Sequence, residues 1–300
     1  MSPKQALPNI QHTVAVASGK GGVGKTTVTV NLALALHSLG ARVGIFDADI
    51  FGPNVPLMLG IHRHKPGGGF VPTARRKDAK PYIQPLERFG LKVMSMGLIV
   101  AEDQVINPLA EVAGQVVVET LRSVDWGALD YLLIDLPPSA GQPQQGLLEN
   151  IALAGVVVVT TPQDLSLLDS SRSLLRYTEA GVPILGVVEN MSYFICPNCG
   201  ERHEIFQHSR QWQPEALQAV PLLGRIPMAA EISRGIDRTH PLMADIAGGR
   251  LDSERAAGGR RPAAGQASAQ VDAFLNIARA VQTRLGAGEP APGRRTDRRS

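Results

Sequence analysis

The sequence predicts an α/β fold in which a mostly parallel, open sheet carries helices on both faces. Several short runs are apolar at every position rather than at alternate positions, which is typical of strands buried on both sides in a parallel sheet. Segments of helical periodicity alternate with these runs, and this alternation indicates repeated βαβ units. Because such sheets bind ligands at the carboxyl ends of their strands, functional residues are expected there.

The strands and helices can be placed in chain order. The predicted strands are Thr13–Ala17, Arg42–Phe46, Leu91–Met96, Tyr131–Leu136, Gly155–Thr160 and Ile184–Val188. Helices are predicted over Thr26–Leu39, with leucines and an alanine on one stripe, and over Leu165–Ala180. Ala267–Leu285 is predicted to be an amphipathic C-terminal helix. Because it has too few basic residues for a membrane-binding helix, we expect it to dock on the protein's own core.

The remaining stretches look irregular in composition. His62–Lys80, with three consecutive glycines and a basic cluster, is predicted to be a long surface loop, and Gly248–Gln266 is rich in Ala, Gly and Arg. The predicted organisation is therefore a main domain over residues 8–245, a flexible insertion over 246–266, a helix packed on the same domain over 267–285 and a disordered basic tail over 286–300.

Composition excludes several classes of protein. A chain of 300 residues with 44% hydrophobic and 19% charged residues supports a buried core and is not a disordered chain. It contains no apolar run long enough to span a membrane, and its first residues lack the apolar core of a signal peptide, so we expect a cytoplasmic protein. Most of the net charge of +3 comes from the arginine-rich tail, so it does not indicate nucleic-acid binding.

A phosphate-binding loop follows the first predicted strand. The stretch SGKGGVGKTT matches G-x-x-x-x-G-K-[ST] from Gly19 to Thr26, between a strand and a helix. Its glycines let backbone N–H groups point at phosphate oxygens, and the helix adds its positive dipole end. ATP with Mg²⁺ is therefore expected, with Lys25 on the β and γ phosphates and Thr26 on the metal. The nucleotide-binding residues predicted here are Gly19, Lys20, Gly21, Gly22, Val23, Gly24, Lys25, Thr26 and Thr27.

Carboxylates end two of the predicted strands. Asp135 closes YLLIDLPP and is expected to hold the metal through a bound water, and Asp47 and Asp49 follow another strand in FDAD. Three carboxylates converging on one site indicate a cation that compensates them, so Thr26, Asp47 and Asp135 are the predicted Mg²⁺ ligands. The alternative is that Asp47 or Asp49 only caps the next turn.

Both cysteines lie in one motif, Cys196-Pro-Asn-Cys199, just after the last predicted strand. Two cysteines exclude a disulfide framework, and they fit a reducing compartment. One CxxC provides two thiolates, whereas an all-cysteine iron–sulfur or zinc site takes four, so a symmetric pair of chains would complete the site. Zinc held within one chain by the cysteines with His203 and His208, and zinc bridging two chains, stay open as alternatives. Thioredoxin-like exchange is less favoured, because that motif opens a helix.

The early lysine of the loop, Lys20, makes GKGGVGKT resemble the deviant Walker A class of ATPases. The ordered blocks DADIFGPNVPLMLG, GLKVMSMG, WGALDYLLIDLPP, VVTTPQDLSLLD, GVVENMSYFICPNCG and LLGRIP resemble the Mrp/ApbC family within that class, over roughly residues 8–245. The resemblance implies a P-loop ATPase that binds a bridging 4Fe–4S cluster as a homodimer and hands it to apo iron–sulfur proteins, with scaffold proteins as further partners. It implies slow ATP hydrolysis, with Lys20 reaching the partner's nucleotide, Lys25 on the phosphates and Asp49 orienting the attacking water. It also places Asn190 on the adenine edge and Pro227 in the base pocket.

Two blocks depart from the family pattern. Ser139–Gln142 replaces the Gly-Thr-Gly-Asp that usually follows DLPP, and Ile106–Gln115 replaces a Trp-Arg-Gly-Pro block. The competing functional class is a spatial organiser of the MinD/ParA type, which uses the same ATP-dependent dimer to bind membrane or DNA. The CPxC motif and the weak basic surface argue against it, so neither nucleic acid nor membrane is expected as a partner.

Overall fold

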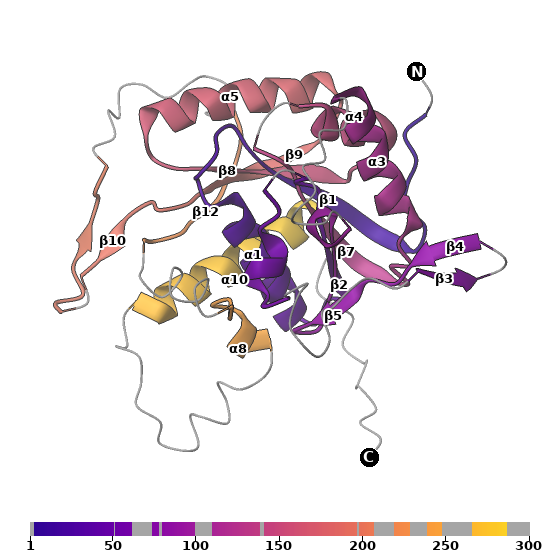
Figure 1. Cartoon of the computed structure of the whole chain (residues 1–300). Helices are drawn as coiled ribbons and strands as arrows, with labels where there is room; N and C mark the ends of the chain where they lie inside the picture. Colours follow the sequence, from indigo (N-terminus) through magenta and orange to yellow (C-terminus); the bar gives the residue numbers. More distant parts are fainter. Residues whose placement is uncertain are drawn as a thin grey trace, which may run out of the picture.

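The computed structural model of the chain (Figure 1) describes residues 3–50, 52–61, 74–77, 80–99, 110–138, 141–196, 198–206, 219–228, 239–247 and 266–286. An eight-stranded sheet lies at its centre, in the order β12-β9-β8-β1-β7-β2-β6-β5. Neighbouring strands are parallel except for β5 and β6, which pair antiparallel at one edge. The strands are β1 (Ile10–Ser18), β2 (Val43–Asp47), β5 (Leu86–Arg88), β6 (Leu91–Ser95), β7 (Leu129–Asp135), β8 (Gly155–Thr160), β9 (Ile184–Glu189) and β12 (Leu222–Arg225).

Helices cover both faces of this sheet, as Figure 1 shows. One face packs against α1 (Lys25–Ser38), α2 (Val55–Met58), α8 (Ala244–Ala247) and α10 (Gln266–Arg284). The other face packs against α3 (Ala110–Ser123), α4 (Gln142–Asn150) and α5 (Asp164–Glu179). Successive residues of a strand point to opposite faces, so Val14 and Val16 belong to the first core and Ala15 and Ala17 to the second.

The predicted α/β class and all the predicted strands are confirmed. Each strand begins and ends within a few residues of its expected bounds, and Gly155–Thr160 agrees at both ends. The helices predicted at Thr26, Leu165 and Ala267 each begin one residue earlier. The first of them, α1, is buried all round instead of along one stripe, because α8 and α10 cover the side that faces away from the sheet.

The sequence failed to predict several elements. α4 and the two edge strands β5 and β12 had no clear periodic signal. α3 was overlooked although its sequence is amphipathic, with Ala113, Val117 and Leu121 on the buried face. Residues predicted to lie in the surface loop His62–Lys80 form an antiparallel hairpin of β3 (Ala74–Lys77) and β4 (Lys80–Ile83), so that prediction is wrong for the hairpin. Pairing of the two arms satisfies the backbone groups without an apolar pattern. Residues 62–73, 78 and 79 lie outside the described residues.

The boundaries predicted for the C-terminal part need two corrections. The last residues of α8 fall inside the predicted flexible insertion 246–266, and Gln266 is already the first residue of α10. Residues 248–265 and 287–300 lie outside the described residues, so the insertion and tail remain predictions.

The two blocks that depart from the family pattern are described only in part. Residues 110–115 lie in α3 and Gly141 caps α4, while 106–109, 139 and 140 are outside the described residues.

The phosphate-binding loop lies at the switch point of the sheet, where successive connections leave in opposite directions. β1 pairs with β7 on one side and β8 on the other, and the chain passes from β1 through α1 to β2. Parallel α/β sheets bind ligands at this place. None of the helices in the described part of the chain combines the length and apolar character needed to cross a membrane.

Candidate functional site

The loop between β1 and α1 has the backbone that a phosphate cradle requires. Gly22 and Gly24 adopt φ angles of 81° and 82°, a left-handed conformation that residues with a Cβ rarely take. Gly24 is the N-cap of α1 and offers no side chain to bond the first N–H groups of the helix. These donors are therefore available to an anion at the helix end.

Asp135 is the centre of the polar network under this loop. The Lys25 ammonium lies 2.7 Å from its Oδ1, and the Thr26 hydroxyl donates to its Oδ2 at 2.7 Å. Both Lys25 and Asp135 are buried. A third donor was missed by sequence reasoning: Thr29, one turn beyond Thr26, also bonds Oδ1 at 2.7 Å. Spacing of hydroxyl residues on one face of α1 was the signal that could have identified it.

Asp47 lies beside Asp135 on the neighbouring strand, since the two residues are in register between β2 and β7. Its carboxylate accepts hydrogen bonds from the backbone N–H groups of Asp49 and Val55 and from the Ser95 hydroxyl, at 3.0 to 3.2 Å. Burial, with the charge of Asp135 as a second cause, raises the pKa of Asp47 to about 8. Ser95 carried no sequence signal.

This arrangement fits the predicted Mg²⁺. Lys25 balances the charge of Asp135, and the raised pKa of Asp47 reflects the cost of ionising a second buried carboxylate beside it. The oxygens of Thr26, Asp47 and Asp135 are those that Mg²⁺ prefers. These residues remain proposed metal ligands.

Asp49 does not join the other two carboxylates. Its Oδ1 accepts the backbone N–H of Gly52 at 3.0 Å, which is the turn-capping role left open as an alternative. Across the described residues, no three His, Cys, Asp or Glu side chains gather closely enough to hold a metal ion. The prediction that three carboxylates converge on one site is therefore wrong for Asp49.

Asp49 instead lines a cavity of about 340 Å³ over the loop. The cavity is also lined by most of the predicted nucleotide-binding residues of the loop and of the first turn of α1. These are Lys20, Gly21, Gly22, Gly24, Lys25, Thr26 and Thr27. Sequence reasoning missed a further wall formed by Asn54, Leu57 and Met58 around α2 and by Pro138 after β7. Gly19, Val23, Asn190 and Pro227 are not among its lining residues.

Asn190 lies behind the loop, and Pro227 is on a neighbouring segment. The Asn190 amide donates to the Val23 carbonyl at 2.9 Å, so it holds the loop from its buried side. The segments that contain the two residues run next to each other, because Ser192 N–H bonds Ile226 O at 2.9 Å and Met228 N–H bonds Tyr193 O at 2.7 Å. Their predicted contact with the base stays a prediction.

The cysteine motif lies in a small hairpin of β10 (Phe194–Ile195) and β11 (Arg202–His203), at the end of the chain segment that follows β9 (Figure 1). Cys196 is partly buried and Cys199 is exposed, and both are free thiols. Backbone N–H groups of Cys199 and then Asn198 lower the pKa of the Cys196 thiol. A thiol with this environment ionises more readily, as metal ligation requires.

The alternative of zinc held within one chain depends on His203 and His208. His203 is exposed on β11 and forms no metal-binding group with the two cysteines among the described residues, and His208 lies outside them. The motif occupies a hairpin turn and not the start of a helix, unlike a thioredoxin-type site.

Comparison with known proteins agrees with this geometry. Residues 9–255 match the model of the ParA family described as NUBPL iron-transfer P-loop NTPase. An iron–sulfur cluster carrier protein of Synechocystis is 39% identical over 241 residues, which are 80% of this chain and 67% of that protein. The iron–sulfur cluster transfer protein NUBPL of Dictyostelium discoideum is 38% identical over 80% of this chain and 72% of its own length. The chain spans about two thirds of the length of the bacterial carriers that it matches.

Solved structures show the same fold. A nucleotide-binding protein of Archaeoglobus fulgidus in complex with ADP superposes with a TM-score of 0.61 at 34% identity, covering 77% of this chain and 87% of that chain. MinD of Pyrococcus horikoshii with Mg-ADP has a TM-score of 0.61 at 24% identity, covering 92% and 97% of the two chains. With the loop, the cysteine hairpin and these likenesses together, the chain belongs to the iron-transfer P-loop NTPases of the ParA class, the family of the iron–sulfur cluster carriers.

Proposed function

We propose that this protein is an ATP-dependent carrier that receives a 4Fe–4S cluster between two copies of the chain and passes it to apo iron–sulfur proteins. The observation that carries the proposal is the pair of accessible thiols in the β10–β11 hairpin. One chain offers two thiolates, and a cluster of this type takes four cysteine ligands. Two hairpins facing each other would supply them.

The phosphate loop supplies the energy-coupling site. Lys25 balances the charge of the β and γ phosphates, and the N–H groups at the start of α1 bond their oxygens. Thr26, Asp47 and Asp135 would hold Mg²⁺, which adds positive charge to the phosphate oxygens when bound. Asn190 keeps the loop in place through the Val23 carbonyl.

Hydrolysis needs a positioned water and a cation at the phosphoryl group. Asp49 lines the cavity and offers a carboxylate to orient the water, while Lys20 supplies a second ammonium at the cavity wall. In the proposed dimer this lysine acts on the partner's nucleotide, so turnover and subunit packing are linked. The family resemblance implies slow ATP hydrolysis. A slow rate is expected if the hydrolytic site is complete only when two chains associate.

The two sites are connected through a short stretch of chain. Asn190 bonds the loop, and the residues that follow it lead directly into β10 and Cys196. Glu189 is held by the Ser192 hydroxyl and by Arg225, whose Nε lies 3.2 Å from its carboxylate. A shift of the loop on nucleotide binding would therefore reach the root of the hairpin, which is how ATP could change the exposure of the cargo.

Anaerobic reconstitution with iron and sulfide tests the proposal. We expect about two iron and two sulfide per chain, a visible charge-transfer absorbance and a mass of two chains in light scattering. Cys196→Ala and Cys199→Ala should each abolish these signals. The matched control is Asn198→Ala, which changes the same turn and keeps both thiols.

The outcomes separate the alternatives. Equal iron and sulfide content in the cysteine variants would overturn the carrier proposal. Zinc in place of iron, without sulfide but still lost in the cysteine variants, would favour a zinc-bridged ATPase. ATP-dependent, salt-sensitive binding to DNA or to anionic vesicles, with no cluster, would favour a MinD/ParA-like spatial organiser.

A further inference from the structure

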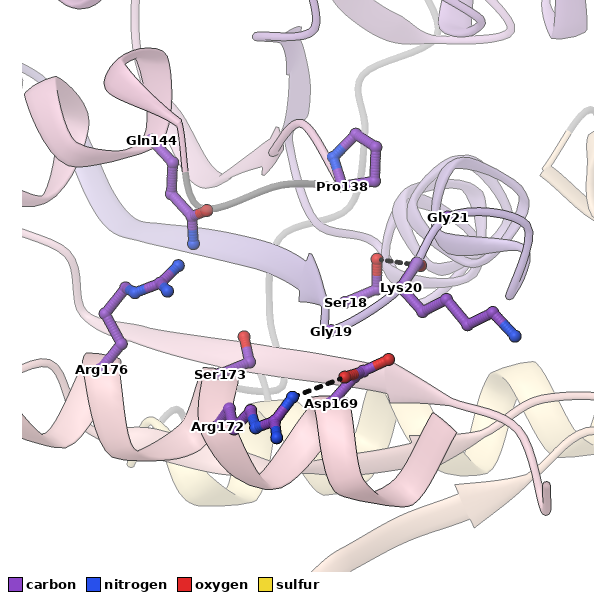
Figure 2. Close-up of a pocket in the computed structure, with 10 residues that line it drawn as sticks. All are labelled: Ser18, Gly19, Lys20, Gly21, Pro138, Gln144, Asp169, Arg172, Ser173 and Arg176. Atoms are coloured by element: carbon purple, nitrogen blue, oxygen red, sulfur yellow. Dashed lines mark hydrogen bonds and ion pairs between the residues drawn. The ribbon is translucent and has the colours of Figure 1, made fainter. Parts of the chain in front are cut away.

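A second cavity lies on the other side of the phosphate loop, between the loop, α4 and α5 (Figure 2). Its volume is about 430 Å³, within the range of small-molecule sites. Ser18, Lys20, Gly21 and Pro138 line both this cavity and the nucleotide cavity, so the loop is a shared wall. The proposed function gives Lys20 a role toward the partner's nucleotide, but it assigns no role to the α5 side chains that form the rest of this second cavity.

The charges around this cavity favour an anion. Lys20, Arg172 and Arg176 line it, and Asp169 is the one carboxylate among the described lining residues, which leaves a formal charge of +2. Arg172 lies 3.5 Å from Asp169, but its side chain is 77% exposed, and ion pairs this open to water hold their partners weakly. Figure 2 shows Arg176 extending from α5 toward Gln144 on α4, at the opposite end of the cavity from Lys20.

The floor of the cavity is polar and uncharged. Gln144 and Ser173 are buried and line the cavity, and both hydrogen-bond the buried phenol of Tyr177. Burial raises the pKa of Tyr177 to about 12, so this phenol adds no negative charge at physiological pH. Hydroxyl and amide groups beside cations are the usual companions of a bound phosphate.

The walls of the cavity are in direct backbone contact. A Cβ on Gly19 would lie 2.3 Å from the Asp169 carbonyl carbon and 2.5 Å from the Ser170 nitrogen, so the loop rests on α5 without an intervening side chain. The backbone of α5 from which the two arginines extend is thus held at a fixed place relative to the loop. Such preorganisation lowers the entropic cost of binding a charged ligand.

We propose that Lys20, Arg172 and Arg176 form a second phosphate-binding site next to the nucleotide site. A phosphate group carries about −1.5 to −2 charge at neutral pH, which matches the formal charge of the cavity. Guanidinium groups bind its oxygens in pairs, and the ammonium adds a point charge. The phosphate has two possible sources: a free small anion, or the phosphate chain of a nucleotide held by a second copy of this chain. The proposal does not depend on the cluster cargo.

The test uses the full chain loaded with Mg-ADP, so that the nucleotide cavity is filled, and inorganic phosphate as the titrant at constant ionic strength. We expect calorimetry to show binding that weakens about tenfold or more in the double variant Arg172→Gln, Arg176→Gln, because charge-assisted hydrogen bonds are lost. Both arginines are exposed, so the fold should persist, which circular dichroism checks. The double variant Arg279→Gln, Arg284→Gln on α10 loses the same charge and should bind phosphate like the wild type.

Light scattering in the presence of Mg-ATP distinguishes the two sources. If the ligand is a free anion, phosphate binds while the mass of the protein does not change. If the ligand belongs to a second copy, the arginine double variant self-associates less and free phosphate competes with self-association. The proposal would be overturned if the arginine double variant bound phosphate and self-associated like the wild type. It would also be overturned if the wild type bound no phosphate and the double variant self-associated to the same extent. Iron and sulfide content, measured on the same variants, reports separately on the proposed carrier function.

Discussion

Asp135 shows how a single residue organises the phosphate site. It accepts from Lys25, Thr26 and Thr29, all from α1, while it stands at the end of β7 and is almost completely buried. A buried charge with this many partners fixes the helix relative to the sheet. Loss of one partner of a buried ion pair is costly, since the other charge stays behind without compensation.

Lys25 and Asp49 should separate binding from turnover. We expect Lys25→Ala to abolish nucleotide binding in calorimetry and to lower the free energy of unfolding by about 3 to 5 kcal/mol, because Asp135 loses its counter-ion.

Asp49→Ala should still bind ATP and lose about a hundredfold or more in turnover. Asp49→Asn is the matched control, since its amide oxygen can still accept from Gly52 N–H. Wild-type turnover in Asp49→Asn would show that ATP hydrolysis requires only the hydrogen bond to Gly52, and it would refute the role of the Asp49 carboxylate in orienting the water.

Asp47 gives the nucleotide-free protein an unusual pH dependence. Its folded-state pKa of about 8 lies above the ordinary value of 3.8, because of burial first and of Asp135 second. The folded state therefore holds more protons than the unfolded state between these values, so the contribution of Asp47 to stability falls as the pH rises through this window. The loss is at most about 1.4 kcal/mol per pH unit.

Urea unfolding of wild type and Asp47→Asn between pH 5 and 8 measures this contribution. We expect the wild type to lose stability relative to the variant as the pH rises, and the difference to shrink when Mg-nucleotide is present, since a cation favours the ionised carboxylate. A difference that is constant with pH would contradict the raised pKa. The slope is the readout, so an overall loss of stability in the variant does not affect it.

At the scale of elements, the loop and α5 form one unit because Gly19 leaves no space between them. The turns at Gly22 and Gly24 shape the loop, but Gly19 decides where it rests. A movement of the loop would therefore either break this contact or take α5 with it, and α5 carries the arginines of the second cavity.

Replacement of Gly19 should be much more harmful than replacement of Gly21. A Cβ on Gly19 meets backbone at 2.3 Å, whereas one on Gly21 meets only a Pro138 carbon at 3.9 Å. We expect Gly19→Ala to lower the free energy of unfolding by about 1 to 3 kcal/mol through overpacking and to weaken nucleotide binding. Gly21→Ala should unfold at nearly the wild-type midpoint. Thermal unfolding compares the two, and equal midpoints would contradict the direct contact between the loop and α5.

At the scale of the whole molecule, the C-terminal helix belongs to the core of the ATPase fold. Phe274, Ile277, Ala278 and Val281 of α10 are fully buried with residues of α1 and the sheet. The last helix in the chain thus covers the helix that starts the nucleotide site. We expect the described core to unfold in one cooperative step.

Truncation of a side chain on α10 tests this packing. Phe274→Ala should lower the free energy of unfolding by about 3 to 5 kcal/mol, because it leaves a cavity in the core shared with α1. Leu222→Ala, an apolar truncation on β12 at a side chain that is 51% exposed, should stay within about 0.5 kcal/mol. Urea unfolding measures both, and a small effect at Phe274 would show that α10 is not part of the core.

Much of the fold and of the loop could be predicted because their signals are local. Continuous apolar runs identified the central strands, which are buried on both faces, and the glycine spacing identified the phosphate loop. The edge strands and α4 were missed because an edge strand is short and half exposed and α4 has few apolar residues. α3 was missed although its amphipathic pattern is local and readable, with Ala113, Val117 and Leu121 on one face. Thr29 and Ser95 were missed for a different reason: their role depends on a carboxylate that is distant in sequence.

By itself, the sequence determined the α/β class, the phosphate loop and the two thiols of the CPxC motif, because each depends on residues that are neighbours along the chain. Only the tertiary structure decided that Asp47 and Asp135 lie side by side, that Asp49 accepts from the Gly52 N–H, and that Asn190 supports the loop. It also decided that Lys20 shares a cavity with arginines of α5. The physical reason is that strand order and register arise from packing helices on both faces of the sheet, which brings distant residues into contact in a way that no local pattern records.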